Sequence, residues 1–324
     1  MAAGRAGFDV ASVMTTFCRT APASESCEAV QGREGRRFGI LALMNDVESI
    51  WQAFDRDGYA VVRGFLSPQE VETLGRDIDE VAAAAAEKRA SWRHGNLTYR
   101  LGADRDGTMR PRMAQWMAYA FPAFDRLRTD PRFYEILGPR LGPDIKQIIN
   151  QLHWKPPGAA SSDFAFHQDS RFRKPFEAYR NLGRSYVQTG IAVDPHGPES
   201  GGMRFAPGSH KEGPLELDTS NEVMSSDMAA AELEAVGVAE EDLVDLVMEP
   251  GDLALWSPYL VHGSGRNRAQ HQRRFLINGY VRAEDCDRGE YAFRGGEPAP
   301  LSGEPALVHY EQLRERPEPH FLDA

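Results

Sequence analysis

The sequence has few cysteines and no long apolar run. Of its 324 residues only three are cysteines, Cys18, Cys27 and Cys286. They fit no zinc-binding spacing, and an odd number suits a reducing compartment better than a disulfide framework. No apolar stretch approaches the roughly 20 residues that a membrane-spanning helix needs, and polar residues interrupt the N-terminus where a signal peptide would be apolar. We therefore predict a cytoplasmic protein with no membrane partner.

Runs of basic residues are lacking as well. The chain has 37 Lys and Arg against 48 Asp and Glu, and its formal net charge is −11. This balance excludes an extended nucleic-acid-binding surface. Neither a coiled-coil heptad nor a repeat of 20–50 residues is present, so the sequence leaves monomer and homodimer open. A hydrophobic fraction of 41% is typical of a packed globular protein that needs no disulfides.

Composition divides the chain near residue 43. Residues 1–43 are rich in Ala, Gly, Ser and Arg and show weak periodicity. They are predicted to be a disordered N-terminal extension, or an over-long gene start with the true start at Met44. Residues 44–324 are predicted to form a single domain, with an acidic helical insertion near 225–242.

Helix signals dominate the first part of this domain. Asn45 with Glu48, and Ser67 with Glu70, fit capping boxes, the second followed by Pro68 at the first helical position. The remaining expectations are a strand over 59–65, a helix from Pro68 to about 88, a polar, arginine-rich loop or lid over 91–112, and helical periodicity over 121–141.

Strand signals follow. Apolar and polar residues alternate in short runs that Gly and Pro separate. The predicted strands are 148–155, 164–170, 185–193, 202–206, 245–249, 252–256 and 273–282. Short helices followed by a strand series predict a mainly β jelly roll, with the helices on one face.

A candidate metal site comes from His167, Asp169 and His262. In a strand, residues i and i+2 share a face, so His167 and Asp169 would project together. His262 follows 95 residues later, in a segment suited to bringing a ligand to the same barrel mouth. Two imidazoles and one carboxylate can bind one face of an octahedral ferrous ion, whereas catalytic zinc prefers a tetrahedral site. A solvated His-Asp pair and a histidine that caps a turn remain the alternatives.

Two predicted strands carry polar residues on a face that should be inward. Arg273 shares its face with apolar residues, and a buried guanidinium there must be paired, which suits a carboxylate ligand. Arg274 falls on the other face and is predicted to be solvated or paired at the surface. A second face is too polar for an ordinary core, so it either contacts a polar ligand or faces solvent, and it carries Gln151, His153 and Lys155.

Three further polar residues are weaker candidates for ligand binding. Gln188 lies in the strand over 185–193. Arg171 and Arg173 closely follow the metal strand, where they would either meet an anionic substrate or face solvent.

These motifs resemble the phytanoyl-CoA dioxygenase family of iron(II)- and 2-oxoglutarate-dependent oxygenases. The resemblance covers roughly residues 45–282. It rests on Asp57–Leu66, Lys155-Pro156-Pro157, His167-Gln168-Asp169, Ser200-Gly201-Gly202-Met203, Pro207-Gly208-Ser209-His210, Gly251-Asp252, and His262-Gly263-Ser264-Gly265 with Asn267 and Arg273.

The resemblance implies a double-stranded β-helix whose His167, Asp169 and His262 bind Fe(II). It also implies that Arg273 binds the distal carboxylate of 2-oxoglutarate, with Lys155 and Gln188 where members contact this co-substrate. O2 is the oxidant, and ascorbate is a candidate reductant. Gln151, His153 and Arg171 are candidates for substrate binding.

The implied activity is hydroxylation of an unactivated C–H bond of a small-molecule metabolite, with release of succinate and CO2. Two alternatives stay open. The same iron centre could perform desaturation, epimerisation or cyclisation in natural-product biosynthesis, or the jelly roll could be a binding protein without catalytic activity.

Overall fold

The computed structural model of the protein describes residues 47–104, 107–158, 164–217, 230–306 and 316–322. The predicted extension over 1–43, the capping residue Asn45 and the first part of the predicted acidic insertion, 225–229, lie outside the described residues. Within the described residues, no helix is both long enough and apolar enough to cross a bilayer.

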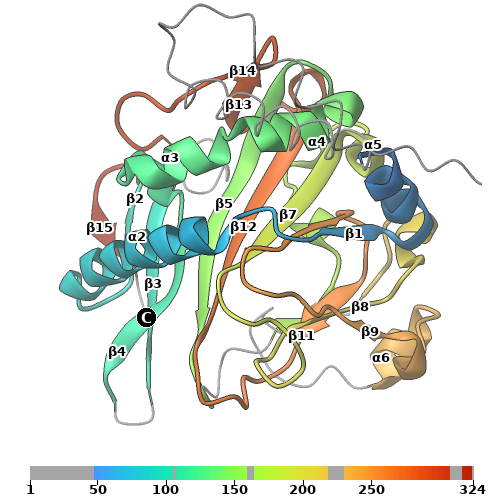
Figure 1. Ribbon diagram of the computed structural model, residues 1–324, viewed down its shortest axis with the longest axis horizontal. Helices are drawn as coiled ribbons and strands as arrows, with labels where there is room; N and C mark the ends of the chain where they lie inside the picture. Colours follow the sequence, from blue (N-terminus) through green and yellow to red (C-terminus); the bar gives the residue numbers. More distant parts are fainter. Residues whose placement is uncertain (1–46, 105–106, 159–163, 218–229, 307–315, 323–324) are drawn as a thin grey trace, which may run out of the picture. The chain divides into compact units, whose positions relative to one another are not determined.

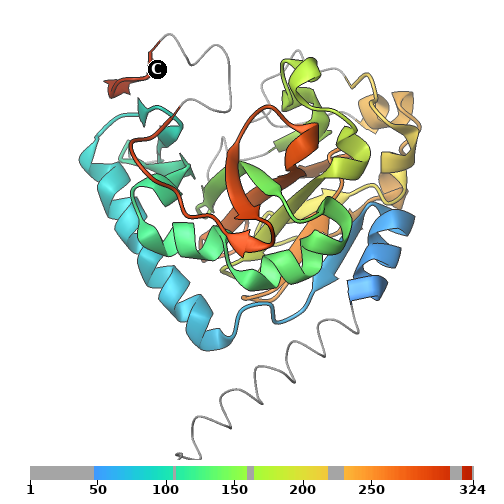
Figure 2. The same cartoon turned by 90° about the horizontal axis from the view of Figure 1, so that it is seen from above.

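Helices come first and cover one face of a large sheet (Figures 1 and 2). Residues 47–57 are helical. The predicted capping box is confirmed, because Ser67 Oγ accepts from Glu70 N at 3.3 Å and Glu70 Oε2 accepts from Ser67 N at 2.8 Å. The further α-helices of the described residues are α2 (Pro68–Glu87), α3 (Pro122–Arg128), α4 (Pro131–Leu141), α5 (Leu182–Ser185) and α6 (Ala230–Ala235).

The strands begin with β1 and continue to the C-terminal part of the chain. They are β1 (Tyr59–Val62), β2 (Trp92–His94), β3 (Leu97–Ala103), β4 (Met109–Gln115), β5 (Ile145–Lys155), β6 (Phe164–His167), β7 (Tyr186–Ala192), β8 (Met203–Phe205), β9 (Val244–Asp245), β10 (Leu253–Trp256), β11 (His262–Ser264), β12 (Arg273–Arg282), β13 (Glu290–Arg294), β14 (Glu297–Pro298) and β15 (His320–Phe321).

Within the described residues these strands form two antiparallel sheets. The larger has eleven strands in the order β1-β10-β7-β12-β5-β4-β3-β2-β15, with β13 beside β5 and β14 beside β13. The smaller has the order β6-β11-β8-β9. Two facing antiparallel sheets with helices on one outer face confirm the predicted jelly roll.

The prediction of a loop or lid over 91–112 is wrong. This range holds β2, β3 and part of β4, which extend the large sheet beyond β5. Its arginines concealed the strand pattern because polar residues there do not all face solvent. Arg112, for example, is buried and donates to Asp104 Oδ1 at 2.5 Å and to Ala103 O at 3.1 Å.

Two of the predicted strands also differ from the structure in their bounds. The strand predicted over 164–170 ends at His167, because a 3₁₀ turn, η4 (Asp169–Phe172), begins two residues later. Of the strand predicted over 245–249 only Asp245 lies in a strand, β9, and Met248 forms an isolated bridge to His196. In the described part of the acidic insertion, α6 and η7 (Glu240–Asp242) are helical.

The core lies on both sides of β12. Sequence alternation indicated one inward face for this strand, but β12 is central, between β5 and β7, and both of its faces are covered. Tyr280 faces the helices: its ring centroid lies 5.2 Å from that of Phe133 in α4, and its hydroxyl donates to Arg128 O at 2.9 Å. The opposite face, with Phe275 and Ile277, is directed towards the small sheet.

Candidate active site

Strand pairing brings the two candidate histidine ligands together. β11 runs antiparallel to β6, and the register places His262 directly opposite His167. The centroids of the two imidazole rings lie 4.4 Å apart. The 95-residue separation in sequence is therefore closed by one pair of neighbouring strands in the small sheet.

Asp169 completes a cluster with these two imidazoles. One donor atom from each residue lies within 4.8 Å of the others, and all three side chains are buried. His167 Nε2 is 3.7 Å from Asp169 Oδ1, and His262 Nε2 is 3.7 Å from Asp169 Oδ2. Asp169 is the first residue of η4 and does not belong to β6. Gln168, which connects the two elements, still has an extended backbone. Two nitrogens and a carboxylate on one side of a cavity are a suitable donor set for ferrous iron.

Backbone carbonyls determine the tautomer of both imidazoles. His167 Nδ1 lies 2.7 Å from Ala165 O, and His262 Nδ1 lies 2.8 Å from Leu260 O. A carbonyl oxygen can only accept, so each Nδ1 carries the proton. The lone pair of each Nε2 is then free to bind a metal, an arrangement typical of histidine ligands.

The charges of the three groups also suit a cation. Burial alone would raise the pKa of the Asp169 carboxyl, but His262 and His167, with Arg173, outweigh it and hold that pKa below its usual range. Burial and the neighbouring His167 lower the pKa of His262 to about 4, although Asp169 opposes this. At neutral pH the cluster therefore offers an anionic carboxylate, and His262 is a neutral imidazole.

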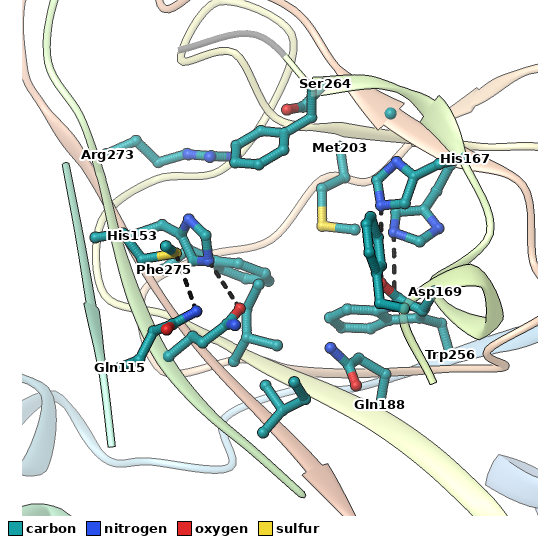
Figure 3. A pocket seen from close by; sticks show the side chains of 18 of the residues that line it. Gln115, His153, His167, Asp169, Gln188, Met203, Trp256, Ser264, Arg273 and Phe275 are labelled. Atoms are coloured by element: carbon teal, nitrogen blue, oxygen red, sulfur yellow. Dashed lines mark hydrogen bonds and ion pairs between the residues drawn. The ribbon is translucent and has the colours of Figure 1, made fainter. Parts of the chain in front are cut away.

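The cluster lies at one side of a cavity of about 220 Å³ between the two sheets. Strands β4, β5, β7, β10 and β12 of the large sheet and β6, β8 and β11 of the small sheet contribute to its wall. Figure 3 shows His167, Asp169 and Trp256 on one side of this cavity and Arg273 on the opposite side. A ligand that extends from the cluster to Arg273 would thus cross the cavity.

Arg273 is oriented as the alternation of β12 predicts. It lines the cavity and is only 3% exposed, and its Nε and Nη1 have no hydrogen-bond partner within the described residues. Burial lowers the pKa of Arg273 to about 10, against the opposing effect of Asp194, so the guanidinium is charged at neutral pH. Arg274 faces the other way and binds Asp194 through Nε at 2.9 Å and Nη2 at 2.8 Å.

Lys155 is buried but does not line the cavity. Its ammonium donates to Gly201 O at 3.2 Å, Ser264 Oγ at 2.9 Å and Gly265 O at 2.6 Å. These acceptors lie at the end of β11 and in the turn before β8. Lys155 therefore connects the large sheet to the loops of the small sheet, and direct contact with a co-substrate stays a prediction.

The other candidates for ligand binding divide between cavity and surface. Gln151, His153 and Gln188 line the cavity. His153 lies 3.2 Å from Gln151 Oε1, and burial lowers its pKa to about 3. Arg171 lies outside the described cavity wall, with its guanidinium 5.1 Å from the ring centroid of Phe172. Arg173, two residues later, is 1% exposed and lines the cavity.

Two residues near the cluster were missed by sequence reasoning. Trp256 donates from its indole nitrogen to Asp169 Oδ2 at 2.9 Å. Gln168 donates to Gly213 O at 2.9 Å and Tyr259 O at 2.6 Å and accepts from Leu215 N at 2.8 Å. The sequence feature that could have indicated this role is the position of Gln168 between His167 and Asp169. A strand residue between two inward side chains points into the opposite layer.

Comparison with known proteins supports an oxygenase site. The profile of the family described as "Phytanoyl-CoA dioxygenase (PhyH)" matches residues 54–275. A methylphosphonate hydroxylase from Gimesia maris is 26% identical over 239 residues, covering 74% of this chain and 82% of the relative. A probable alpha-ketoglutarate-dependent hypophosphite dioxygenase from Stutzerimonas stutzeri is 27% identical over 231 residues, covering 70% and 76%.

Solved structures share the fold. The crystal structure of EctD from S. alaskensis with 2-oxoglutarate and 5-hydroxyectoine matches with a TM-score of 0.55 at 21% identity. The match covers 80% of this chain and 85% of that one. At this identity the likeness establishes the jelly-roll architecture, and the chemistry has to be argued from the residues of the cavity.

Proposed function

The chain belongs to the phytanoyl-CoA dioxygenase family of iron(II)- and 2-oxoglutarate-dependent oxygenases, and from this premise we propose that it hydroxylates a C–H bond of a small-molecule metabolite. The single observation that carries the proposal is the convergence of His167, Asp169 and His262 at one side of the cavity between the two sheets. We assign these three residues as the iron ligands.

The donor set fits ferrous iron in both protonation and arrangement. Each histidine donates its Nδ1 proton to a backbone carbonyl and directs Nε2 towards the carboxylate. These hydrogen bonds orient the rings before any metal arrives, which lowers the cost of ordering the site. The described cluster holds three protein donors, so an octahedral ion would keep positions for other ligands.

Arg273 supplies the charge that a dicarboxylate co-substrate requires. It lies across the cavity from the proposed iron ligands, and its buried cation has donor atoms without partners in the described part of the chain. A carboxylate can satisfy a guanidinium through two parallel hydrogen bonds. We therefore assign Arg273 to the distal carboxylate of 2-oxoglutarate.

The remaining lining residues limit what can happen in the cavity. When bound, iron(II) and 2-oxoglutarate supply the oxidising chemistry, in which O2 is consumed, 2-oxoglutarate becomes succinate and CO2, and an oxygen atom enters a C–H bond of the substrate. Phe164, Phe275 and Trp256 give the cavity wall an apolar part, which would keep water from the reacting groups once the ligands are bound. Polar residues from β5 and β7 are then available to orient the substrate.

Anaerobic loading tests this proposal directly. Iron(II) and 2-oxoglutarate added to the metal-free protein should produce a weak visible charge-transfer band, and the Asp169→Ala variant should not produce it. Succinate release is then screened with small metabolites, including methylphosphonate and hypophosphite because relatives are named for them. Failure of the wild-type protein to bind 2-oxoglutarate with iron would overturn the proposal. Mass analysis of the product separates hydroxylation from desaturation, epimerisation and cyclisation.

A further inference from the structure

Two rows of neighbouring strand residues form the end of the cavity that lies away from Arg273. The rows consist of Gln115, Gln151 and Ile277, and of Ile149, Gly279 and Gln188. Ile277 and Gly279 follow Arg273 on the same face of β12, four and six residues later. Because a strand rises about 3.3 Å per residue, the rows lie about 13 Å and about 20 Å along β12 from Arg273. This end of the cavity is therefore separate from the guanidinium assigned to 2-oxoglutarate.

The second row continues to the proposed iron site. Gln188 of β7 lies opposite Trp256 of β10 in the strand register, and the Trp256 indole donates to the Asp169 carboxylate. A molecule held at this end of the cavity would lie beside the iron ligands, whereas 2-oxoglutarate would extend from them to Arg273. The two rows thus surround the space that remains for the substrate.

Gln151 is held by its amide oxygen. His153 Nε2 lies 3.2 Å from Gln151 Oε1, and an amide oxygen only accepts, so Nε2 carries the proton. Burial, and then Arg273 and Lys155, lower the pKa of His153 to about 3, so the ring is neutral at physiological pH. The ring also packs edge-on against Phe164, with centroids 5.5 Å apart. Within the described residues no group accepts a hydrogen bond from the NH2 group of Gln151, which is left for a ligand.

Gln188 is held in the same way from the other side. Tyr186 Oη accepts from Arg173 Nη2 at 3.3 Å, so its single proton is directed to Gln188 Oε1. Burial raises the pKa of Tyr186, which keeps that proton in place. Figure 3 shows the amide nitrogen of Gln188 directed into the cavity and its oxygen directed away. No acceptor for this nitrogen is present in the part of the chain that the structure describes.

The backbone and two isoleucines shape the space between these amides. A Cβ atom at Gly279 would lie 2.5 Å from Tyr186 Oη and 2.7 Å from Gln188 Oε1, so no side chain fits there without displacing both groups. Ile149 and Ile277, on either side, line the cavity and are apolar. This end of the cavity therefore combines an apolar floor with one N–H donor group from β5 and one from β7.

The two amides require the same kind of partner. An NH2 group only donates, so each needs an acceptor from the ligand. Ether, carbonyl and hydroxyl oxygens accept hydrogen bonds, whereas an ammonium group does not. Gln115, opposite Gln151 in β4, adds a third amide, whose nitrogen lies 3.8 Å from the Met113 sulfur, a weak acceptor. A ligand without acceptor oxygens would displace water from these N–H groups and leave them unpaired, which is unfavourable.

We propose that Gln151 and Gln188 bind two acceptor oxygens of one substrate molecule, and that the apolar part between these oxygens carries the C–H bond beside the iron ligands. The inference rests on the proposed function, because iron and 2-oxoglutarate must occupy the other part of the cavity. It assigns the substrate to small compounds with carbonyl, ether or hydroxyl oxygens at two positions. His153 and Tyr186 are positioning residues, since they hold the two amides by their oxygens.

The tautomer of His153 tests the orientation of Gln151 without any ligand. Nitrogen NMR of the metal-free protein distinguishes a protonated from an unprotonated imidazole nitrogen, and the His153→Gln variant identifies the signals by their loss. We expect the proton on Nε2 at neutral pH. A proton on Nδ1 would reverse the amide of Gln151 and present its oxygen to the cavity, which would overturn the inference.

Two rings of the same shape test the requirement for acceptors. 1,4-Dioxane carries two ether oxygens on opposite sides of its ring, and tetrahydropyran carries one. Their dissociation constants are measured by anaerobic calorimetry on the protein loaded with iron(II) and 2-oxoglutarate. Dioxane should use both glutamines at once, whereas tetrahydropyran can turn its single oxygen to either one.

Methionine variants should then give different results for the two rings. Gln151→Met and Gln188→Met nearly keep the side-chain volume but remove the N–H donors, so each should weaken dioxane binding about three- to tenfold, as expected for one neutral hydrogen bond. Tetrahydropyran binding should change less than about twofold in either single variant and should weaken when both glutamines are replaced. Gln69→Met, exposed on α2, is the matched control and should change neither.

The affinity for 2-oxoglutarate separates failure of this inference from failure of the proposed function. If the wild-type protein does not bind 2-oxoglutarate with iron, the proposed function fails. If it does, but dioxane does not bind or binds equally to wild type and variants, only the substrate subsite is wrong. Equal weakening of both rings in the single variants would indicate a general disturbance of the cavity and would also overturn the subsite. A Gln188 variant that loses 2-oxoglutarate would assign this residue to the co-substrate instead, as the family resemblance implies.

Discussion

The indole nitrogen of Trp256 donates a hydrogen bond of 2.9 Å to Oδ2 of Asp169, across 87 residues of sequence. Trp256 is the last residue of β10 in the large sheet, whereas Asp169 follows β6 of the small sheet. The bond therefore connects the two sheets at the proposed metal site. It also orients the carboxylate, because one of its oxygens is held by a group that is itself almost fully buried.

Replacing Trp256 by Phe should weaken metal binding without unfolding the protein. The ring volume is largely kept, but the N–H donor to Asp169 is lost. Loss of a hydrogen bond to a metal-binding carboxylate typically reduces affinity about tenfold to a hundredfold. Competition with a chelator measures the change, and Trp154→Phe in β5 serves as the control. Equal metal affinity in the two variants would contradict a positioning role for Trp256.

Replacing Asp169 should abolish activity. Asp169→Ala removes the carboxylate ligand, and Asp169→Asn keeps its shape but removes its charge. Both variants should lose hydroxylation and bind iron more weakly, as measured by metal content after anaerobic dialysis. Asp245→Ala, on the exposed β9, is the control. Near-normal turnover in either Asp169 variant would refute the ligand assignment.

The sequence predicted the strands correctly where apolar and polar residues alternate along the chain. The bounds of β12 were predicted to the residue, and Arg273 was separated correctly from Arg274, because apolar residues alternate with polar ones through that strand. The same reasoning failed over 91–112. There Arg112 is buried although it is charged, with Nη2 bound to Asp104 Oδ1 and Ala103 O, so polarity did not indicate exposure.

The sequence indicated which residues form the candidate site, but it did not indicate how these residues are placed relative to one another. His167, Asp169 and His262 were chosen for the donor types they offer. That His262 lies opposite His167 depends on which strands become neighbours, and sequence periodicity carries no information on strand order. The difference between Arg171 and Arg173 depends on η4, which replaces the predicted strand and directs only the second guanidinium into the cavity.

The two consecutive arginines of β12 should have different phenotypes. Arg273→Gln should raise the concentration of 2-oxoglutarate required for half-maximal turnover by tenfold to a hundredfold or more, because a buried charged hydrogen bond is lost. Arg274→Gln should leave this value nearly unchanged but lower the melting temperature, since it breaks the bonds to Asp194. The opposite pattern would show that the assigned roles of the two strand faces are reversed.

Lys155 should contribute chiefly to stability. In Lys155→Met the aliphatic stem is kept, but Gly201 O, Ser264 Oγ and Gly265 O lose their shared donor. Leaving buried acceptors unsatisfied costs about 1–3 kcal/mol each before relaxation, so we expect a clear fall in the urea midpoint. Calorimetry at a temperature where the variant is folded then compares its 2-oxoglutarate affinity with wild type. A large loss of affinity with unchanged stability would instead favour direct contact with the co-substrate.

Acid should destabilise the metal-free protein through its buried histidines. Burial lowers the pKa of His153 to about 3 and that of His262 to about 4, whereas both titrate near 6.5 in the unfolded chain. Between these values the unfolded chain binds protons that the folded one does not, so the free energy of unfolding falls as pH falls from about 6.5 towards 4.

The His153→Gln variant removes one of these two titrating groups. Glutamine can still form a hydrogen bond with Gln151 but cannot take up a proton, so the variant should lose less stability than wild type between pH 7 and pH 4. The difference should reach up to about 3 kcal/mol at pH 4. Urea titrations measure it, and calorimetry in two buffers of different ionisation enthalpy should count about one proton fewer on unfolding. An identical pH dependence in wild type and variant would mean that His153 is protonated in the folded cavity, which would add a positive charge to the wall opposite Arg173.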